Sequence, residues 1–312
     1  MNILKYICLP GLLVSGDIQT VSAGESKTDK NPNILVILID DAGYNDFGFM
    51  GSKEMQTPNI DALTSEGVVF TDAHVAATVS SPSRACLITG RYGHRFGYEC
   101  NLSDRTNGLP LEEETIAEVF KTNGYRTAAI GKWHLGSRDE QHPNNRGFDL
   151  FYGMKAGGRD YFYNEKKSDR PGDERNLLLN DRQVKFEKYL TDAFSEKAVE
   201  FINESSQPFM MYLAYNAVHT PMQATDEDMA KFEGHPRQKL AAMTYALDRG
   251  VGTVIRGLKD SGKFDNTLIF FLSDNGGATT NQSSNYPLKG FKGNKFEGGH
   301  RVPYFVVWKN GI

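Results

Sequence analysis

The stretch ILVILI at residues 34–39, followed directly by Asp40 and Asp41, decides the fold. It is a continuous apolar run of strand length, which is typical of a strand buried on both faces of a sheet. Short apolar runs of the same kind recur at 126–130, 209–215, 267–272 and 304–308. Together these runs predict a buried central sheet.

Helical patterns alternate with the predicted strands, at 59–66, 111–122, 191–203 and 237–260. In the last of them, apolar residues recur every three to four positions, as on the buried face of a helix. Strands that alternate with helices predict an α/β fold with a mixed, mostly parallel central sheet sandwiched by helices. The charged, irregular stretch 157–185 is expected to form surface loops, where substrate contacts often lie.

Composition indicates an ordinary globular protein with one large domain. The chain has 312 residues, of which 39% are hydrophobic and 24% charged, with a formal net charge of -4. The 35 basic and 39 acidic residues form no long run of one sign, so no nucleic-acid-binding surface is expected. No segment has about 18 consecutive apolar residues, so no membrane span is expected either.

Residues 1–23 have the pattern of a signal peptide. Lys5 precedes an apolar stretch at 7–14, and small residues at 21–23 suit signal peptidase. This predicts a secreted or periplasmic protein, with a linker at 24–32 and a catalytic domain at 33–312. The apolar run is short and contains Pro10, so a disordered or core-bound N-terminus is the alternative. With Cys8 in the signal, Cys86 and Cys100 remain, and the sequence does not say whether they are bonded.

Polar residues follow the predicted strands directly. In open α/β sheets, ligands bind outside the carboxyl ends of the strands. Asp40 and Asp41 follow one strand, and Asp274 and Asn275 follow another. Each Asp alone would more often be a turn or cap residue. Three carboxylates together repel one another unless a cation lies between them, and all-oxygen ligation with room for a substrate oxygen favours Ca²⁺ over Mg²⁺.

Basic residues occupy similar positions. Lys132 and His134 follow the strand at 126–130 and would share one face of an extended chain, and His219 follows the strand at 209–215. A lone histidine there would more often be a packing residue. Together with Lys292, these residues would surround the ion with donors suited to a dianionic tetrahedral ester.

The segment Ser80-Ser81-Pro82-Ser83-Arg84 precedes a predicted helix that begins near Ala85. By composition alone it is a polar turn that caps this helix. The functional alternative is that the helix N-terminus, with its free amides and positive dipole end, receives an anion beside Ser80.

The sequence resembles the type I sulfatase family of the alkaline phosphatase superfamily. The family signature is Cys or Ser, any residue, Pro-Ser-Arg, and then Thr-Gly-Arg, and it is matched by Ser80, Pro82-Ser83-Arg84 and Thr89-Gly90-Arg91. Further family motifs are matched in order by Asp40-Asp41, Thr57-Pro58-Asn59, GKWHLG at 131–136, His219-Thr220-Pro221, Ser273-Asp274-Asn275-Gly276, Lys292-Gly293, Glu297-Gly298-Gly299 and Arg301-Val302-Pro303. The resemblance therefore runs from about residue 33 to the end, and it implies an alkaline phosphatase-like fold.

By this resemblance, Ser80 is the residue that a sulfatase-maturating enzyme oxidises to formylglycine, an aldehyde that hydrates to a diol. A plain serine attacking sulfur would leave a stable sulfate ester, whereas the second hydroxyl of a diol lets sulfate leave as the carbon–oxygen bond breaks. The resemblance implies one Ca²⁺, held by Asp40, Asp41, Ser80, Asp274 and Asn275. The implied catalytic residues are Ser80, Arg84, Lys132, His134, His219 and Lys292.

Within this set we expect Arg84 and Ca²⁺ to hold the nucleophile, and Lys132 and Lys292 to neutralise the sulfuryl oxygens. His219 would protonate the leaving sugar oxygen and His134 would accept the proton that triggers sulfate release, although the two roles could be exchanged. Family members carry a smaller C-terminal subdomain after the equivalent of RVPYFVVWKNG (301–311), so the resemblance predicts a catalytic domain shortened at that end. The signature residue Ser80, in place of the commoner Cys, is either natural or a substitution that blocks maturation.

The stretches Tyr152-Gly153 and 158–162 are similar to the arylsulfatase B-like branch, whose members act on sulfated sugars. This predicts a sulfated saccharide as the substrate, with the sugar and position open. One alternative is a phosphoester hydrolase in which unmodified Ser80 attacks phosphorus, although such enzymes often use two metals. The other is a sulfated-glycan-binding protein in which Ser80 is never oxidised.

Overall fold

The computed structural model describes residues 31–101 and 108–311. The predicted signal peptide, Cys8 and most of the predicted linker lie outside the described residues. Within the described ranges, no helix combines the length and the apolar character that crossing a bilayer requires. Cys86 and Cys100 are both free thiols.

The described residues form one mixed sheet of nine strands in the order β2-β9-β8-β1-β7-β3-β4-β5-β6. The five strands from β8 to β4 run parallel, and antiparallel strands extend the sheet at both edges. The predicted α/β class with a mostly parallel sheet is confirmed. The strands are β1 (Asn33–Ile39), β2 (Gly67–Val69), β3 (Arg126–Lys132), β4 (Leu150–Met154), β5 (Leu178–Leu179), β6 (Arg182–Gln183), β7 (Phe209–Ala214), β8 (Thr267–Ser273) and β9 (Tyr304–Val307).

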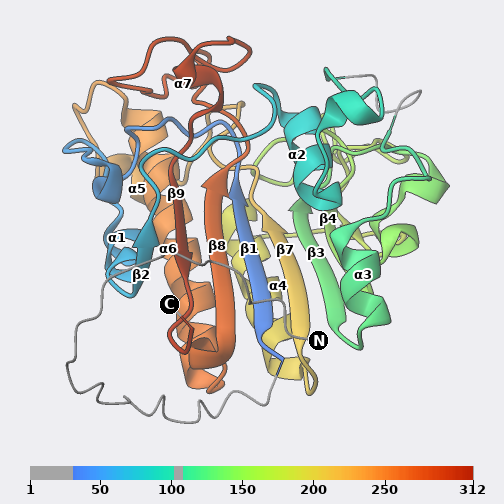
Figure 1. Cartoon of the computed structure of the whole chain (residues 1–312). Coiled ribbons are helices and arrows are strands. Elements are labelled where there is room, and N and C mark those ends of the chain that lie inside the picture. Colours follow the sequence, from blue (N-terminus) through green and yellow to red (C-terminus); the bar gives the residue numbers. More distant parts are fainter. Residues whose placement is uncertain (1–30, 102–107, 312) are drawn as a thin grey trace, which may run out of the picture. The chain divides into compact units, whose positions relative to one another are not determined.

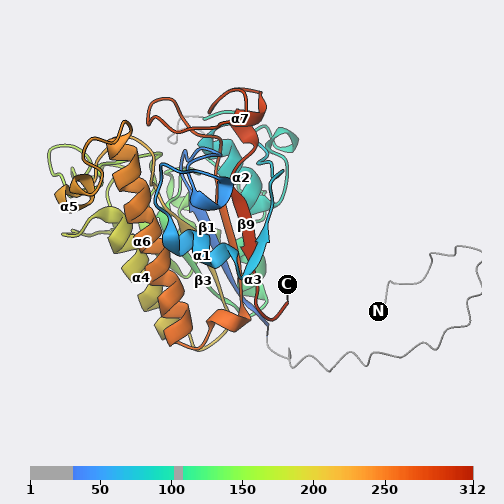
Figure 2. The same cartoon turned by 90° about the vertical axis from the view of Figure 1, so that its left-hand side faces the viewer.

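Helices cover both faces of the sheet, with α4 and α6 on one side and α2 and α3 on the other (Figures 1 and 2). Strand β1 shows why, because all of its residues are buried. Leu35, Ile37 and Ile39 belong to the core cluster with α1, α4 and α6, and the alternate residues belong to the cluster with α2 and α3. The helices are α1 (Pro58–Thr64), α2 (Ser80–Thr89), α3 (Ile116–Thr122), α4 (Leu190–Glu204), α5 (Asp226–Ala230), α6 (Gln238–Asp260) and α7 (Glu297–His300).

Two predicted helices begin elsewhere than expected. Helix α2 begins at Ser80 rather than near Ala85, so the signature segment is its first turn and not a turn before it. Helix α3 begins at Ile116 and not at residue 111. There the Thr115 hydroxyl accepts from the backbone N–H of Glu118, whose side chain accepts from the backbone of Thr115, and this capping box sets the start of the helix.

The stretch 157–185 is not simply a set of surface loops, as the sequence predicted. It contains β5 and β6, and several of its polar side chains are buried. The Arg159 guanidinium contacts both carboxylate oxygens of Asp169 at 2.8 Å, and both side chains are inaccessible to solvent. Pairing explains how charged residues can lie inside the fold.

Candidate active site

The carboxyl ends of β1 and β8 bring four polar side chains together. The strands pair in parallel with Ile39 opposite Ser273, so the next residues of each strand meet at the same edge. The backbone N–H of Asp41 donates to Asp274 Oδ1 at 3.2 Å, and Asn275 Nδ2 donates to Asp41 Oδ1 at 2.8 Å. Asp40, Asp41, Asp274 and Asn275 are all buried.

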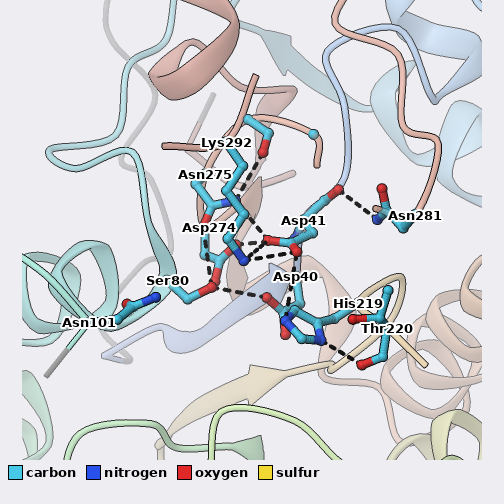
Figure 3. Close-up of polar contacts among 12 residues, drawn as sticks. Asp40, Asp41, Ser80, Asn101, His219, Thr220, Asp274, Asn275, Asn281 and Lys292 are labelled. Carbon is cyan, nitrogen blue, oxygen red and sulfur yellow. Dashed lines mark hydrogen bonds and ion pairs between the residues drawn. The ribbon is translucent and has the colours of Figure 1, made fainter. Parts of the chain in front are cut away.

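Ser80 lies against this group as the first residue of α2 (Figure 3). Its hydroxyl lies 3.2 Å from Asp40 Oδ1 and 3.2 Å from Asn275 Oδ1, so it can donate to either oxygen. The side chain is 1% exposed. The sequence predicted free amides in this first turn, but the backbone N–H of Ser81 donates to Asn101 Oδ1 at 3.0 Å, that of Ser83 donates to the carbonyl of Val79 at 3.2 Å, and Pro82 has no N–H. An anion bound beside Ser80 would still lie at the positive end of the helix dipole.

Each of the three carboxylates has a cationic partner. Lys132 Nζ lies 2.7 Å from Asp40 Oδ2, and Lys292 Nζ lies 2.7 Å and 2.9 Å from the two oxygens of Asp41. Arg84 donates through Nε and Nη2 to Asp274 Oδ2, at 3.0 Å and 2.9 Å. Such charge-assisted contacts allow charged groups to be buried without leaving any of them unpaired.

The charges shift the pKa values of these groups. Burial alone would raise the pKa of Asp40, but the nearby Lys132, with His219 and Arg84, lowers it. Burial lowers the pKa of Lys132, although Asp40 opposes the effect. Burial alone would lower the pKa of Arg84, but Asp274 together with Tyr212 and Asp40 raises it. Burial would likewise lower the pKa of Lys292, but Asp41 together with Asp40 and Asp274 raises it. The carboxylate of Asp40 and the guanidinium of Arg84 are therefore held in their charged forms.

His219 points its Nε2 toward the carboxylates. Its Nδ1 lies 2.6 Å from the carbonyl oxygen of Thr220, an acceptor, so Nδ1 carries a proton and Nε2 faces Asp41 Oδ2 at 3.8 Å. The Tyr161 hydroxyl contacts the backbone carbonyl of His219 at 2.8 Å. Nε2 is therefore the atom of His219 that can exchange a proton with a bound ligand.

His134 lies two residues after the end of β3, where its φ of 59° turns the chain out of the extended conformation. Its pKa is held well below the usual value, first by burial and then by the charges of Lys132 and Arg84. The imidazole is therefore neutral near pH 7. A Cβ added to Gly157 would lie 2.6 Å from His134 Nε2, so this glycine backbone packs directly on the ring.

The donor set fits a hard divalent cation. Asp40, Asp41, Asp274 and Asn275 offer carboxylate and amide oxygens around Ser80, which is the ligand chemistry of Ca²⁺. Asp40, Asp41 and His219 also place one ligand atom each within 4.8 Å of one another. Asp274 shares its Oδ2 with Arg84 and keeps Oδ1 toward Asp41.

The structure thus gathers the residues that the sequence singled out at one edge of the sheet. Contacts link Asp40, Asp41, Ser80, Arg84, Lys132, His219, Asp274, Asn275 and Lys292. His134 lies close enough to this group for the charges of Lys132 and Arg84 to lower its pKa.

The sequence reasoning missed Asn281, whose Nδ2 donates to the backbone carbonyls of Asp41 (3.1 Å) and Val218 (2.9 Å). Asn281 thereby ties the acidic strand end to the segment that carries His219, and Figure 3 shows its contact with Asp41. It lies in a polar loop without a regular pattern, so no local signal marks it.

The chain is similar to known proteins over most of its length. The family model described as Sulfatase matches residues 32–312. The chain is 34% identical to the uncharacterized sulfatase YdeN of Escherichia coli over 92% of this chain and 60% of that protein, and 37% identical to mouse arylsulfatase J over 91% of this chain and 49% of that protein. The crystal structure of Ps i-CgsB in complex with k-i-k-neocarrahexaose has a TM-score of 0.84 and 45% identity, over 89% of this chain and 66% of that one. The chain thus spans about half to two thirds of the length of these proteins, and it belongs to the sulfatase family.

Proposed function

We propose that the protein hydrolyses sulfate esters of a carbohydrate. The observation that carries this proposal is the position of Ser80, which lies at the N-terminus of α2 against Asp40 and Asn275. Lys132, Arg84 and Lys292 contact the carboxylates of the same cluster. A tetrahedral anionic ester bound beside Ser80 would therefore meet cationic side chains and the positive end of the helix dipole.

Two groups would complete this site. Ca²⁺, held by Asp40, Asp41, Asp274, Asn275 and position 80, would supply positive charge for the sulfuryl oxygens. Formylglycine made from Ser80 by a sulfatase-maturating enzyme would supply, as its hydrate, one hydroxyl that attacks sulfur and a second that allows sulfate to leave.

The chain's own residues have distinct tasks in this proposal. Arg84, anchored on Asp274, helps to hold the attacking hydroxyl in place. Lys132 and Lys292 neutralise the negative charge of the sulfuryl oxygens. Negative charge also grows on the leaving oxygen as the ester bond breaks. His219, through Nε2, protonates that leaving oxygen, and neutral His134 accepts the proton whose removal releases sulfate.

The substrate that we propose is a sulfated oligosaccharide of the carrageenan type. The support is the 45% identity to Ps i-CgsB, whose crystal structure holds a neocarrahexaose. Other relatives are named for N-acetylgalactosamine-6-sulfate, so glycosaminoglycan fragments are the natural comparison. We further propose that residues 33–312 form the catalytic domain and that residues 1–23 direct export, so that the protein acts as a secreted or periplasmic enzyme.

Mass spectrometry of the peptide that contains Ser80, from protein made in its own host, tests the chemistry. A loss of two hydrogens at Ser80, together with sulfate release from carrageenan oligosaccharides, supports the proposal. The same protein should be assayed with matched sulfate and phosphate esters of one alcohol. A preference for phosphate with intact Ser80 would favour direct phosphoester hydrolysis, and intact Ser80 with saccharide binding but no turnover would favour a binding protein.

A further inference from the structure

A second group of metal-ligating side chains lies outside the proposed active site. His74 lies in the segment between β2 and α2, and Glu297 and His300 belong to α7. The two segments pair, with His74 opposite Arg301 in an isolated antiparallel bridge. The backbone N–H of Val75 donates to the carbonyl of His300 at 2.8 Å, so the backbone fixes the two segments against each other.

The side chains of this group converge on one point. His74 Nε2 lies 3.1 Å from Glu297 Oε2, and the rings of His74 and His300 have centroids 5.0 Å apart. One ligand atom from each of the three residues lies within 4.8 Å of the others. Two ligands about 2.0–2.1 Å from a tetrahedral ion lie roughly 3.3 Å apart, so the spacing suits a shared ion.

We infer that His74, Glu297 and His300 form a binding site for Zn²⁺. Two imidazoles and one carboxylate are a ligand set for zinc and not for calcium, which takes oxygen ligands. The residues are partly exposed, so an ion can enter and water can complete the coordination. Asp72 Oδ1, 3.8 Å from His74 Nε2, supplies a further carboxylate.

A plain ion pair between protonated His74 and Glu297 is the competing explanation. That ion pair accounts for His74 alone, whereas the ring of His300, with its centroid 5.0 Å from that of His74, also faces the cluster. Arg301 already supplies a positive charge here, with Nη1 3.3 Å from Asp72 Oδ1 and 3.5 Å from Glu297 Oε2. A metal ion shared by the three side chains accounts for both imidazoles and for Glu297, and Arg301 balances the charge of Asp72.

The site would join two segments that matter for the proposed active site. The segment with His74 leads into α2 and Ser80, and α7 follows the loop that carries Lys292. Helix α7 lies beyond the carboxyl end of β8 (Figure 1). Bound Zn²⁺ would therefore hold the Lys292 loop against the start of α2 and stabilise the folded chain.

Zinc titration calorimetry on the whole chain, with excess Ca²⁺ present to occupy the acidic cluster, tests this inference. The wild type should bind Zn²⁺, and its melting temperature should rise as Zn²⁺ is added. Loss of a group that merely orients a metal ligand costs roughly 10–100-fold in affinity, so His74→Ala and His300→Ala should each weaken binding by at least about tenfold. His94→Ala, which removes an exposed histidine elsewhere, should bind like the wild type.

The readout is binding, so it is independent of sulfatase activity and of Ser80 maturation. Circular dichroism should show that the variants are folded, and His74→Gln and His300→Gln replace any alanine variant that is not. A wild type without zinc binding would overturn the inference. So would histidine variants that bind Zn²⁺ as tightly as the wild type, because the zinc would then lie at other residues.

Discussion

Lys132 Nζ lies 2.7 Å from Asp40 Oδ2, and neither side chain is accessible to solvent. Lys132 is the last residue of β3 and Asp40 follows β1, with β7 between these strands in the sheet. The contact therefore joins two strand ends across a third strand. It also holds the carboxylate whose other oxygen accepts from Ser80.

Lys132→Met should destabilise the protein, because it leaves the buried Asp40 without its nearest cation. Breaking a buried ion pair costs about 3–5 kcal/mol, whereas exposed pairs are worth about 0–1 kcal/mol. The matched control is Lys121→Met, which removes the partly exposed contact of 2.7 Å to Asp149. Urea unfolding without divalent ions measures both. Equal losses in the free energy of unfolding would show that the buried Lys132–Asp40 pair contributes no more than the partly exposed pair.

Lys292→Ala should lower turnover by about 10²–10³-fold, the usual effect of removing one group that stabilises transition-state charge. Lys289→Ala is the control from the same loop, since Lys289 is exposed and lies over the Phe296 ring. Steady-state kinetics on a sulfated saccharide compare them. If Lys292→Ala retained the wild-type kcat, Lys292 would have no part in the chemical step.

Ca²⁺ should stabilise the folded protein, by about 2.7 kcal/mol at a free concentration of about 100 times Kd. Asp274→Ala should abolish this stabilisation and the activity together, because it removes one proposed ligand and the anchor of Arg84. Asp265→Ala, which removes an exposed acid 3.4 Å from Lys309, should keep both. Thermal unfolding with Ca²⁺ and after chelation measures the difference. Full calcium stabilisation in Asp274→Ala would show that the ion binds elsewhere.

The sheet and the strand ends could be predicted because buried strands leave long apolar runs and the polar residues after them are conspicuous. The start of α2 could not, since Ser80, Ser81 and Pro82 are residues that favour caps as much as first turns. Charged residues also predict exposure unless their partners are known. The buried Arg159–Asp169 pair therefore appeared in the sequence as part of a surface loop.

The candidate site, too, could be predicted from the sequence only in part. Asp40, Asp41, Asp274 and Asn275 could be grouped because residues that follow parallel strands meet at one edge. Asn281 contacts the backbone of Asp41, 240 residues away, and no periodicity or motif encodes such a contact. The family resemblance placed Lys292 in the site and assigned the role of Ser80. From composition alone, both would have been ordinary polar or charged residues.

Lowering the pH below 6.5 should destabilise the protein, partly through His142. Burial and then Lys155 lower the pKa of His142 from its ordinary value of 6.5. Between the two values the unfolded chain binds more protons than the folded one, so stability is full above 6.5 and is lost as the pH falls. The slope is at most about 1.4 kcal/mol per pH unit for one histidine.

His142→Gln should reduce that slope, and His94→Gln, which changes an exposed histidine, should leave it unchanged. Urea unfolding at a series of pH values measures the slopes. An unchanged slope in His142→Gln would mean that the protonation of His142 does not differ between the folded and unfolded states.

Gly157→Ala should lower kcat strongly while changing the melting temperature little. Its Cβ would lie 2.6 Å from His134 Nε2, closer than side-chain carbons normally approach, so the ring must move from its position. Gly158→Ala is the matched neighbour, because its Cβ would lie 3.2 Å from His219 and requires a smaller shift. We expect kcat to fall strongly in Gly157→Ala and less in Gly158→Ala, with similar melting temperatures. Equal kcat values in Gly157→Ala and the wild type would mean that the position of His134 does not matter to the reaction.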